Sequence, residues 1–241
     1  MPTILITGAA NGLGAAFLET YRTQPDTTIL ALDRQPIQTT HPNVHPHTLD
    51  LTSEPSIQTF TSQIHKIPID LLIHSAGVRS LVPSYVDSNP NDVASAETLA
   101  AMDSQTMLST FQTNTLATFN LLRALIPNLR LAPAPKAIVM SSRMGSVGRN
   151  EAPNPSAGGA YAYRASKAAL NAVVRSLAVD VPEVVFVLCH PGRVETGLVR
   201  TREEGAVEAG EAVGAMVPLI EGWGRGDSGG FFDRFGEVIE W

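Results

Sequence analysis

Short runs of β-branched and aliphatic residues alternate with longer amphipathic segments along the chain, and this alternation most constrains the fold. Most of the short runs are apolar at consecutive positions, as expected for strands that helices cover on both faces. The expected strands span residues 3–7, 28–33, 47–51, 71–75, 137–141, 184–189 and 236–241. Alternating strands and helices predict a parallel sheet with right-handed crossovers.

The segments between the strands show the helical period. Leu13, Phe17 and Tyr21 fall at i, i+4 and i+8, and residues 109–125 and 206–220 repeat this pattern. We therefore predict an α/β fold with a Rossmann-type, doubly wound, seven-stranded parallel sheet and three helices on each face. Residues 1–241 form one domain in this prediction, in which residues 198–220 supply a short substrate lid and a helix.

Composition excludes several classes of protein. With 241 residues, 44% of them hydrophobic and 17% charged, the chain can bury a core without a metal or disulfide and is not disordered. A net charge of −6 argues against nucleic-acid and membrane-surface partners. The single cysteine, Cys189, excludes an internal disulfide. We see neither a signal peptide nor a spanning segment, so we expect a cytoplasmic protein.

A glycine-rich segment follows the first expected strand and opens a helix. It reads Thr7-Gly8-Ala-Ala-Asn11-Gly12-Leu13-Gly14. Glycines let a strand turn sharply into a helix while the backbone approaches a pyrophosphate, which the N–H groups of the helix N-terminus can then bind. A tight turn without a ligand is the alternative.

Asp33 supports the interpretation that a dinucleotide binds at this segment. It ends the second expected strand, about 20 residues after the glycines, where a carboxylate can accept hydrogen bonds from the adenosine ribose. The same charge would repel a 2′-phosphate and favours NAD, while the neighbouring Arg34 offsets that repulsion and keeps NADP as an alternative. A surface acid at a strand end is the structural alternative.

Tyr163 and Lys167 lie four residues apart in a predicted helix and therefore share one face. A nearby ammonium group lowers the pKa of a phenol, which can then exchange a proton with a carbonyl or alcohol oxygen. Ser141 and Ser142 end a predicted strand just upstream, at the edge where open α/β sheets bind ligands. Asn114 lies inside a predicted helix, where its low helix propensity suggests either a function or a solvated amide.

These motifs resemble those of the short-chain dehydrogenase/reductase family, which uses an Asn–Ser–Tyr–Lys tetrad. The resemblance implies Tyr163 as the acid/base and Lys167 as the group that lowers its pKa and binds the nicotinamide ribose. It implies Ser142, rather than Ser141, as the residue that polarises the carbonyl, and Asn114 as the holder of a proton-relay water.

The resemblance extends to further cofactor contacts over essentially the whole chain. These expected contacts are Asp50 and Leu51 at the adenine, Ala76 and Gly77 from an Ala-Gly motif, Pro191 and Gly192 at the nicotinamide face, and Val194 and Thr196 near the carboxamide. The segments around Ser142 and Tyr163 look most like those of C-factor and sniffer-like carbonyl reductases.

Three features depart from the family pattern. His74 and Ser75 stand where two asparagines are usual, which questions the sheet-bracing role of that motif. Ser142 and Tyr163 are 21 positions apart, so loop 148–159, together with loop 78–91, would border the substrate cleft. Asp33 conflicts with the NADP use of many sniffer-like members.

The predicted function is NAD(P)-dependent hydride transfer involving a carbonyl or secondary alcohol of a small organic substrate, with a role in secondary metabolism as one hypothesis. Two alternatives remain: a catalytically silent dinucleotide-binding regulator, and a lyase or epimerase that uses bound NAD transiently. Family resemblance implies a homodimer or homotetramer. We expect no metal site at the cluster His41, His45 and His47, and a buried packing role for Cys189.

Overall fold

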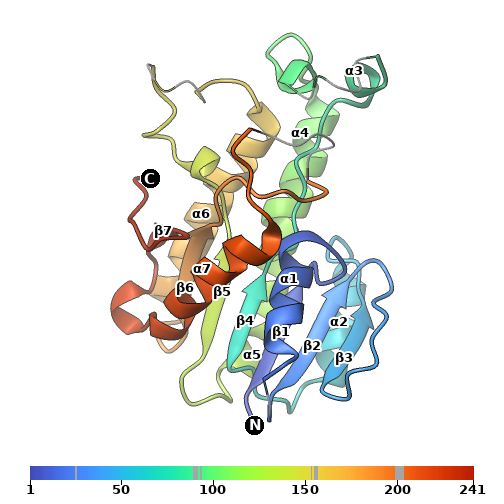
Figure 1. Ribbon diagram of the computed structural model, residues 1–241, viewed down its shortest axis with the longest axis vertical. Coiled ribbons are helices and arrows are strands. Elements are labelled where there is room, and N and C mark those ends of the chain that lie inside the picture. The colour runs from blue at the N-terminus through green and yellow to red at the C-terminus, as the bar shows by residue number, and fades with distance from the viewer. Residues whose placement is uncertain (25, 89–91, 93, 153, 155–156, 199–203) are drawn as a thin grey trace.

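The computed structural model describes residues 1–241 except 25, 89–91, 93, 153, 155–156 and 199–203 (Figure 1). Within the described residues, seven parallel strands form one sheet in the order β3-β2-β1-β4-β5-β6-β7, which confirms the predicted fold class. The strands are β1 (Thr3–Thr7), β2 (Thr28–Asp33), β3 (Val44–Thr48), β4 (Leu71–His74), β5 (Lys136–Met140), β6 (Val185–His190) and β7 (Phe231–Asp233). The order reverses between β1 and β4, where such sheets bind ligands at the carboxyl ends of the strands.

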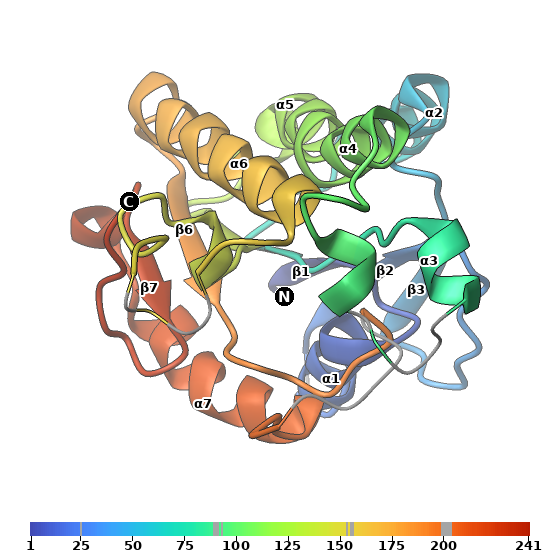
Figure 2. The ribbon, with the colours of Figure 1, turned by 90° about the horizontal axis from the view of Figure 1, so that it is seen from above.

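Helices cover both faces of the sheet, but not in equal number. In the described part of the chain, α1 (Gly12–Tyr21) and α7 (Ala209–Gly222) lie on one face, and α2 (Glu54–Gln63), α5 (Ala117–Leu129) and α6 (Tyr161–Asp180) lie on the other (Figure 2). The prediction of three helices on each face is therefore wrong. Segment 34–43, between β2 and β3, carries Pro36 and Pro42 and forms no helix.

Each face of the sheet has its own hydrophobic core. Successive side chains of a strand point to opposite faces, so Ile4 and Ile6 of β1 pack with α1 and α7, while Leu5 packs with α2, α5 and α6. Cys189 is fully buried in the first of these cores, as expected, and burial raises the pKa of its thiol. Two packed faces leave the carboxyl edge of the sheet as the place where loops gather.

The single helix expected over residues 109–125 is divided into three segments. They are α4 (Ser104–Phe111), a π-helical turn η2 (Gln112–Leu116) and α5. A π-turn inserts an extra residue into the helix and often marks a functional site. Here it contains Asn114, so the residue with an unfavourable helix propensity lies at the irregular turn.

Two expected strands differ in extent from the observed ones. The third is β3 (Val44–Thr48) rather than residues 47–51, and it tolerates Pro46 because β3 is an edge strand of the sheet. The last is β7 (Phe231–Asp233) rather than residues 236–241. Gly236 adopts a positive φ of 85° in a turn, after which Val238 makes an antiparallel bridge to Phe232.

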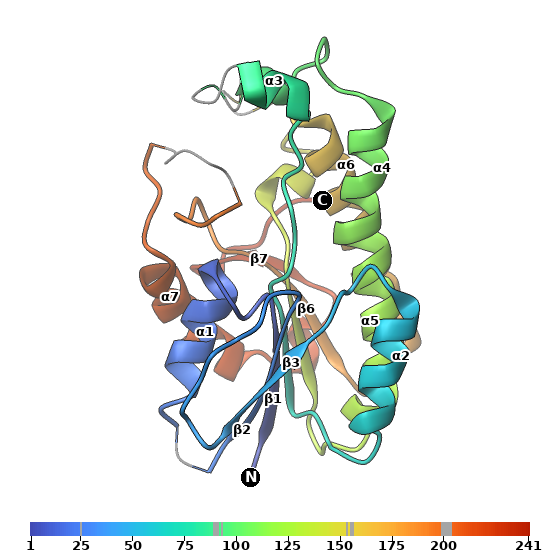
Figure 3. The ribbon, with the colours of Figure 1, turned by 90° about the vertical axis from the view of Figure 1, so that its right-hand side faces the viewer.

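The connections at the carboxyl edge are long. Loop 78–91 contains α3 (Pro83–Ser88), which contacts the 3₁₀ turn η1 (Ala94–Glu97) that follows, and α3 rises above the carboxyl edge of the sheet (Figure 3). Residues 89–91 of this loop, parts of loop 148–159 and residues 199–203 of the expected lid lie outside the described residues. The expected helix after the lid is α7, which begins at Ala209.

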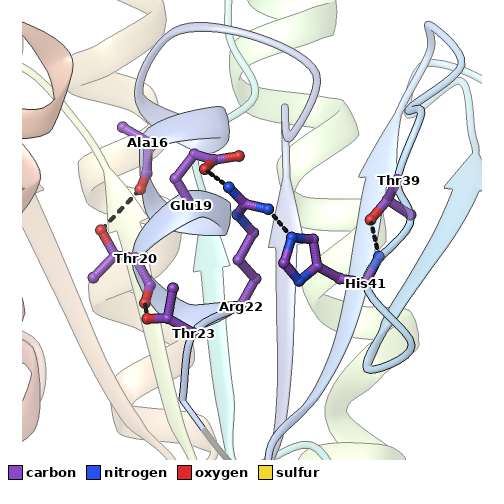
Figure 4. A network of polar contacts seen from close by, with 7 residues as sticks. All are labelled: Ala16, Glu19, Thr20, Arg22, Thr23, Thr39 and His41. Atoms are coloured by element: carbon purple, nitrogen blue, oxygen red, sulfur yellow. Dashed lines mark hydrogen bonds and ion pairs between the residues drawn. The ribbon is translucent and has the colours of Figure 1, made fainter.

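The histidines near β3 contact protein groups. His41 accepts a hydrogen bond from the Arg22 guanidinium, which also pairs with Glu19 (Figure 4), and His47 packs edge-on against Phe60. Among the described residues, no group of three or more histidine, cysteine or acidic side chains could hold a metal ion. None of the described helices has the length and apolarity needed to cross a membrane.

Candidate active site

The bend between β1 and α1 has no room for side chains at its glycines. Gly8 and Gly12 adopt left-handed backbone conformations, with φ of 67° and 55°. A Cβ at Gly14 would lie 2.1 Å from the Gly8 carbonyl oxygen, and one at Gly8 would lie 3.0 Å from the Ala76 nitrogen. Glycine is therefore required here by the close approach of the strand, the helix and the segment after β4.

The same bend fits a dinucleotide pyrophosphate. Asn11 immediately precedes α1 in an extended conformation, and its side chain makes no capping hydrogen bond. The first N–H groups of α1, from Gly12 to Gly14, therefore stay available to an anion at the positive end of the helix. Leu13 is half-buried against the core on the α1 side.

Asp33, the expected ribose contact, ends β2 beside the glycine bend. Its Oδ2 accepts a hydrogen bond from the Ala10 nitrogen at 3.0 Å, and its Oδ1 accepts one from the Gln35 nitrogen at 2.9 Å. The carboxylate thus braces the glycine bend against the end of β2. Each oxygen has a second lone pair, so the group can still accept a hydrogen bond from a ligand hydroxyl.

The other expected cofactor residues gather along the same edge. The Leu49 nitrogen donates to the Asp33 carbonyl, which brings Asp50 and the half-buried Leu51 beside β2. Hydrogen bonds from Thr52 hold the pKa of Asp50 below its usual value. The remaining contacts lie on the segments that follow β4 and β6, namely Ala76, Gly77, Pro191, Gly192, Val194 and Thr196. A Cβ at Gly12 would touch Thr196 at 3.2 Å, so the glycine bend and the segment after β6 meet.

Tyr163 and Lys167 lie one turn apart on α6 and are both buried. The Lys167 Nζ lies 5.8 Å from the centroid of the Tyr163 ring and donates a hydrogen bond to the Met140 carbonyl at 2.9 Å. Burial lowers the pKa of Lys167 to about 8. An ammonium held this close to a phenol favours the phenolate form, which is the chemistry that the sequence predicts for the pair.

The two serines at the end of β5 have different partners. The Ser141 hydroxyl donates to the Asn171 side chain at 2.6 Å, so its proton is committed to a structural contact. Ser142 accepts a hydrogen bond from the Met144 nitrogen and begins the 3₁₀ turn η3 (Arg143–Gly145). This turn packs on α6 so tightly that a Cβ at Gly145 would lie 2.9 Å from Lys167. Because Ser142 acts as an acceptor in its contact with the Met144 nitrogen, its hydroxyl can still donate a hydrogen bond to a ligand.

Asn114 uses its amide group to connect three segments. Its Oδ1 accepts a hydrogen bond from the Val78 nitrogen, and its Nδ2 donates to the Val78 carbonyl and to the Ser166 hydroxyl, over 2.8–3.0 Å. Ser166 lies between Tyr163 and Lys167 on α6. The buried Asn114 therefore fixes α6 relative to the segment after β4, and its expected role in holding a relay water stays a prediction.

His74 is a structural residue of the site whose role the sequence did not reveal. It is buried, with Nδ1 3.0 Å from the Thr7 hydroxyl and Nε2 2.8 Å from the Thr118 hydroxyl. Burial, with the charge of Lys167 as a second cause, lowers the pKa of His74 to about 3. His74 thus braces β1, β4 and α5, so the bracing function that its departure from the family motif had questioned is present.

Comparison with known proteins identifies the family. A family model described as short chain dehydrogenase matches residues 2–206. The chain is 35% identical over 187 residues to the C-signal of Myxococcus xanthus, covering 77% of this chain and 100% of that protein. It is 29% identical to the short chain dehydrogenase gsfK of Penicillium aethiopicum, with 99% of each chain covered.

The chain belongs to the short-chain dehydrogenase family. Among solved structures it is similar to an NADPH-bound carbonyl reductase from chicken fatty liver, with a TM-score of 0.84, 27% identity and coverage of 100% of this chain and 99% of that one. It is also similar to carbonyl reductase Sniffer of D. melanogaster, with a TM-score of 0.79, 27% identity and full coverage of both chains. The protein is therefore an NAD(P)-using oxidoreductase of the kind that interconverts hydroxyl and carbonyl groups.

Proposed function

We propose that this protein reduces a carbonyl group of a small organic substrate, or oxidises the corresponding secondary alcohol, with Tyr163 as the acid/base. The observation that carries the proposal is the buried Tyr163–Lys167 pair, with the ammonium 5.8 Å from the phenol ring, beside a glycine bend that fits a pyrophosphate. When bound, NAD(P) supplies or accepts the hydride.

In this mechanism Tyr163 gives its proton to the carbonyl oxygen, and Lys167 stabilises the phenolate that remains. The Ser142 hydroxyl donates a hydrogen bond to the same oxygen and offsets the negative charge that develops there. Asn114 holds α6 and the segment after β4 in register through Val78 and Ser166. Alcohol oxidation uses the same groups in reverse, with the phenolate as the base.

The dinucleotide would be held by the glycine bend, the ends of β2 and β3, and the segments after β4 and β6, together with Tyr163 and Lys167 at the nicotinamide ribose. The residues of these segments are Gly8, Asn11, Gly12, Leu13, Gly14, Asp33, Asp50, Leu51, Ala76, Gly77, Pro191, Gly192, Val194 and Thr196. The buried carboxylate of Asp33 supports NAD as the preferred form, since it would repel a 2′-phosphate. The carbonyl reductase from chicken fatty liver binds NADPH, so a comparison of NADH and NADPH in this protein tests the expected preference. A cytoplasmic homodimer or homotetramer remains part of the proposal.

The test is turnover of aromatic, polyketide-like and steroid-like ketones with NADH and NADPH, followed by nicotinamide absorbance. We expect turnover by the unmodified protein and a loss of at least about 10²-fold in kcat for Tyr163→Phe, because the proton donor is removed. Near-normal turnover in this variant would contradict the role of Tyr163. Cofactor binding without turnover on any ketone would favour a regulatory protein, and substrate conversion without net absorbance change would favour a lyase or epimerase.

A further inference from the structure

Arg79 and Glu97 form a buried ion pair beside Tyr163, and neither residue belongs to the tetrad. The Arg79 Nε donates to Glu97 Oε2 at 2.9 Å, and Nη2 donates to Oε1. Their side chains are only 13% and 8% exposed. The Arg79 guanidinium carbon lies 5.9 Å from the Tyr163 ring centroid, so a second cation lies about as near to the ring as Lys167 does.

Separate backbone contacts fix the two members of this pair. Arg79 follows Val78, whose nitrogen and carbonyl are both held by the Asn114 amide. The Glu97 carbonyl accepts a hydrogen bond from the Ala160 nitrogen at 2.8 Å, and Ala160 is the residue that precedes α6. The pair therefore connects the segment after β4 to the start of the helix that carries Tyr163.

The charges around Tyr163 come from three elements. In the described part of the chain, Lys167 on α6 and Arg79 after β4 lie by the Tyr163 ring. Glu97 on η1 and Arg164 on α6 lie near Arg79. Burial and the positive charge of Arg79 lower the pKa of Arg164, whereas Glu97 raises it, so the charges of these three side chains interact. Glu97 is the anion among these described groups, and it offsets the field of Arg79 through a bidentate contact.

We propose that the Arg79–Glu97 pair sets the proton affinity of Tyr163. A guanidinium near the ring stabilises a phenolate, whose negative charge is spread into the ring, more than a neutral phenol. Glu97 limits this effect because it is paired with the same guanidinium. The inference rests on the proposed function, in which Tyr163 is the acid/base, and it assigns the pair a positioning and electrostatic role rather than contact with substrate.

The test measures the proton affinity of Tyr163 directly in the full chain without substrate or cofactor. Tyrosine labelled with ¹³C at Cζ gives signals for the four tyrosines, and Tyr163→Phe identifies the signal of Tyr163. We expect Arg79→Met to raise the pKa of Tyr163 by at least about 0.5 pH unit, because a cation is lost. We expect Glu97→Gln to lower that pKa, because the remaining guanidinium is no longer offset.

The opposite directions expected for the Tyr163 pKa in Arg79→Met and Glu97→Gln distinguish an electrostatic role from a general loosening of the loop. Shifts of the Tyr163 pKa in the same direction in both variants, or no shift in either, would overturn the inference. Arg79→Lys keeps the charge but not the bidentate contact, so it should leave the pKa close to that of the unmodified protein. A rise equal to that of Arg79→Met would also count against the proposal.

A matched control and an activity measurement complete the design. The Arg123 guanidinium lies 5.1 Å from the Phe119 ring, and Arg123 is exposed on α5, a different helix from that of Tyr163. Arg123→Met therefore removes a similar cation–ring contact elsewhere in the protein and should not move the Tyr163 pKa. Loss of turnover in Tyr163→Phe with an unmoved pKa in the Arg79 and Glu97 variants would contradict only this inference. Full turnover in Tyr163→Phe would contradict the proposed function itself.

Discussion

His74 donates a hydrogen bond from Nε2 to the Thr118 hydroxyl over 2.8 Å, and this contact links the end of β4 to the start of α5. Thr118 gives its own proton to the Asn114 carbonyl, so it must accept from the imidazole. The opposite nitrogen then accepts from the Thr7 hydroxyl, which itself accepts from the Ser75 and Ala76 nitrogens. A neutral histidine thus connects the glycine bend to the residue that positions α6.

Replacing His74 should therefore weaken the folded state. In His74→Leu the buried Thr7 and Thr118 hydroxyls lose a partner, and we expect the free energy of unfolding to fall by about 2–4 kcal/mol. Urea unfolding measures this change. His65→Ala is the control, because His65 is exposed and its removal should change the free energy of unfolding by less than about 0.5 kcal/mol. Equal stability of the two variants would show that the buried contacts contribute nothing.

The role of His74 also shows where reasoning from sequence stops. The order of strands and helices, the glycine bend and the Tyr163–Lys167 spacing are local patterns, and each was predicted from neighbouring residues. The partners of His74 are Thr7 and Thr118, which lie 67 and 44 positions away. A hydrogen bond over such separations depends on which strands become neighbours, and the spacing of residues does not record it.

Errors in the predicted elements have similar causes. Polar and apolar residues alternate over 44–47 and again over 48–51, so the pattern alone does not determine which of these residues pair with β2. The π-turn around Asn114 inserts one residue into an otherwise regular helical pattern, and the helical period remains visible on both sides of it. The pair Arg79 and Glu97 was not predicted, because their contact follows from the path of loop 78–91.

Gly14 offers a direct test of the bend. In Gly14→Ala the new Cβ would lie 2.1 Å from the Gly8 carbonyl oxygen, so the bend must shift. We expect dinucleotide affinity, measured by calorimetry, to fall at least about tenfold and the protein to lose stability. Gly214→Ala is the control: Gly214 lies within α7 with nothing within 4 Å of the added carbon, and alanine there should stabilise the helix by about 0.5–1 kcal/mol. Unchanged affinity in Gly14→Ala would exclude the bend as the pyrophosphate site.

Asp33 should decide the choice between the two nucleotides. We expect kcat/KM to be higher with NADH than with NADPH, because the carboxylate at the end of β2 repels a 2′-phosphate. Asp33→Asn keeps the size of the side chain and should lower the ratio of kcat/KM with NADH to kcat/KM with NADPH about tenfold or more. Arg34→Ala should raise the same ratio, because it removes the exposed cation beside Asp33 that would attract a 2′-phosphate. A preference of the unmodified protein for NADPH would overturn the interpretation of Asp33.

The lowered pKa of Lys167 predicts that its contribution to the free energy of unfolding becomes more favourable as the pH rises. Burial lowers the pKa of Lys167 from the usual 10.5 to about 8, so below about pH 8 the folded state is destabilised by holding a buried charged amine. The penalty is lost as the pH rises from about 8 to 10.5, because the folded protein then carries a neutral amine while the unfolded chain still binds the proton. In Lys167→Met this penalty is absent, along with the hydrogen bond to the Met140 carbonyl.

We therefore expect Lys167→Met to be inactive yet more stable than the unmodified protein at pH 7. A pKa of about 8 instead of the usual 10.5 corresponds to a stability cost of about 3 kcal/mol for the charged amine. Loss of the hydrogen bond to the Met140 carbonyl offsets about 1 kcal/mol of this gain, so the variant should be about 2 kcal/mol more stable. Urea unfolding at pH 7 and pH 10 should show this advantage shrinking with rising pH. The exposed Lys66 supplies the control, since Lys66→Met should give a stability difference that does not depend on pH over this range. An advantage of Lys167→Met that grew from pH 7 to pH 10 would mean that Lys167 is not a buried amine with a lowered pKa.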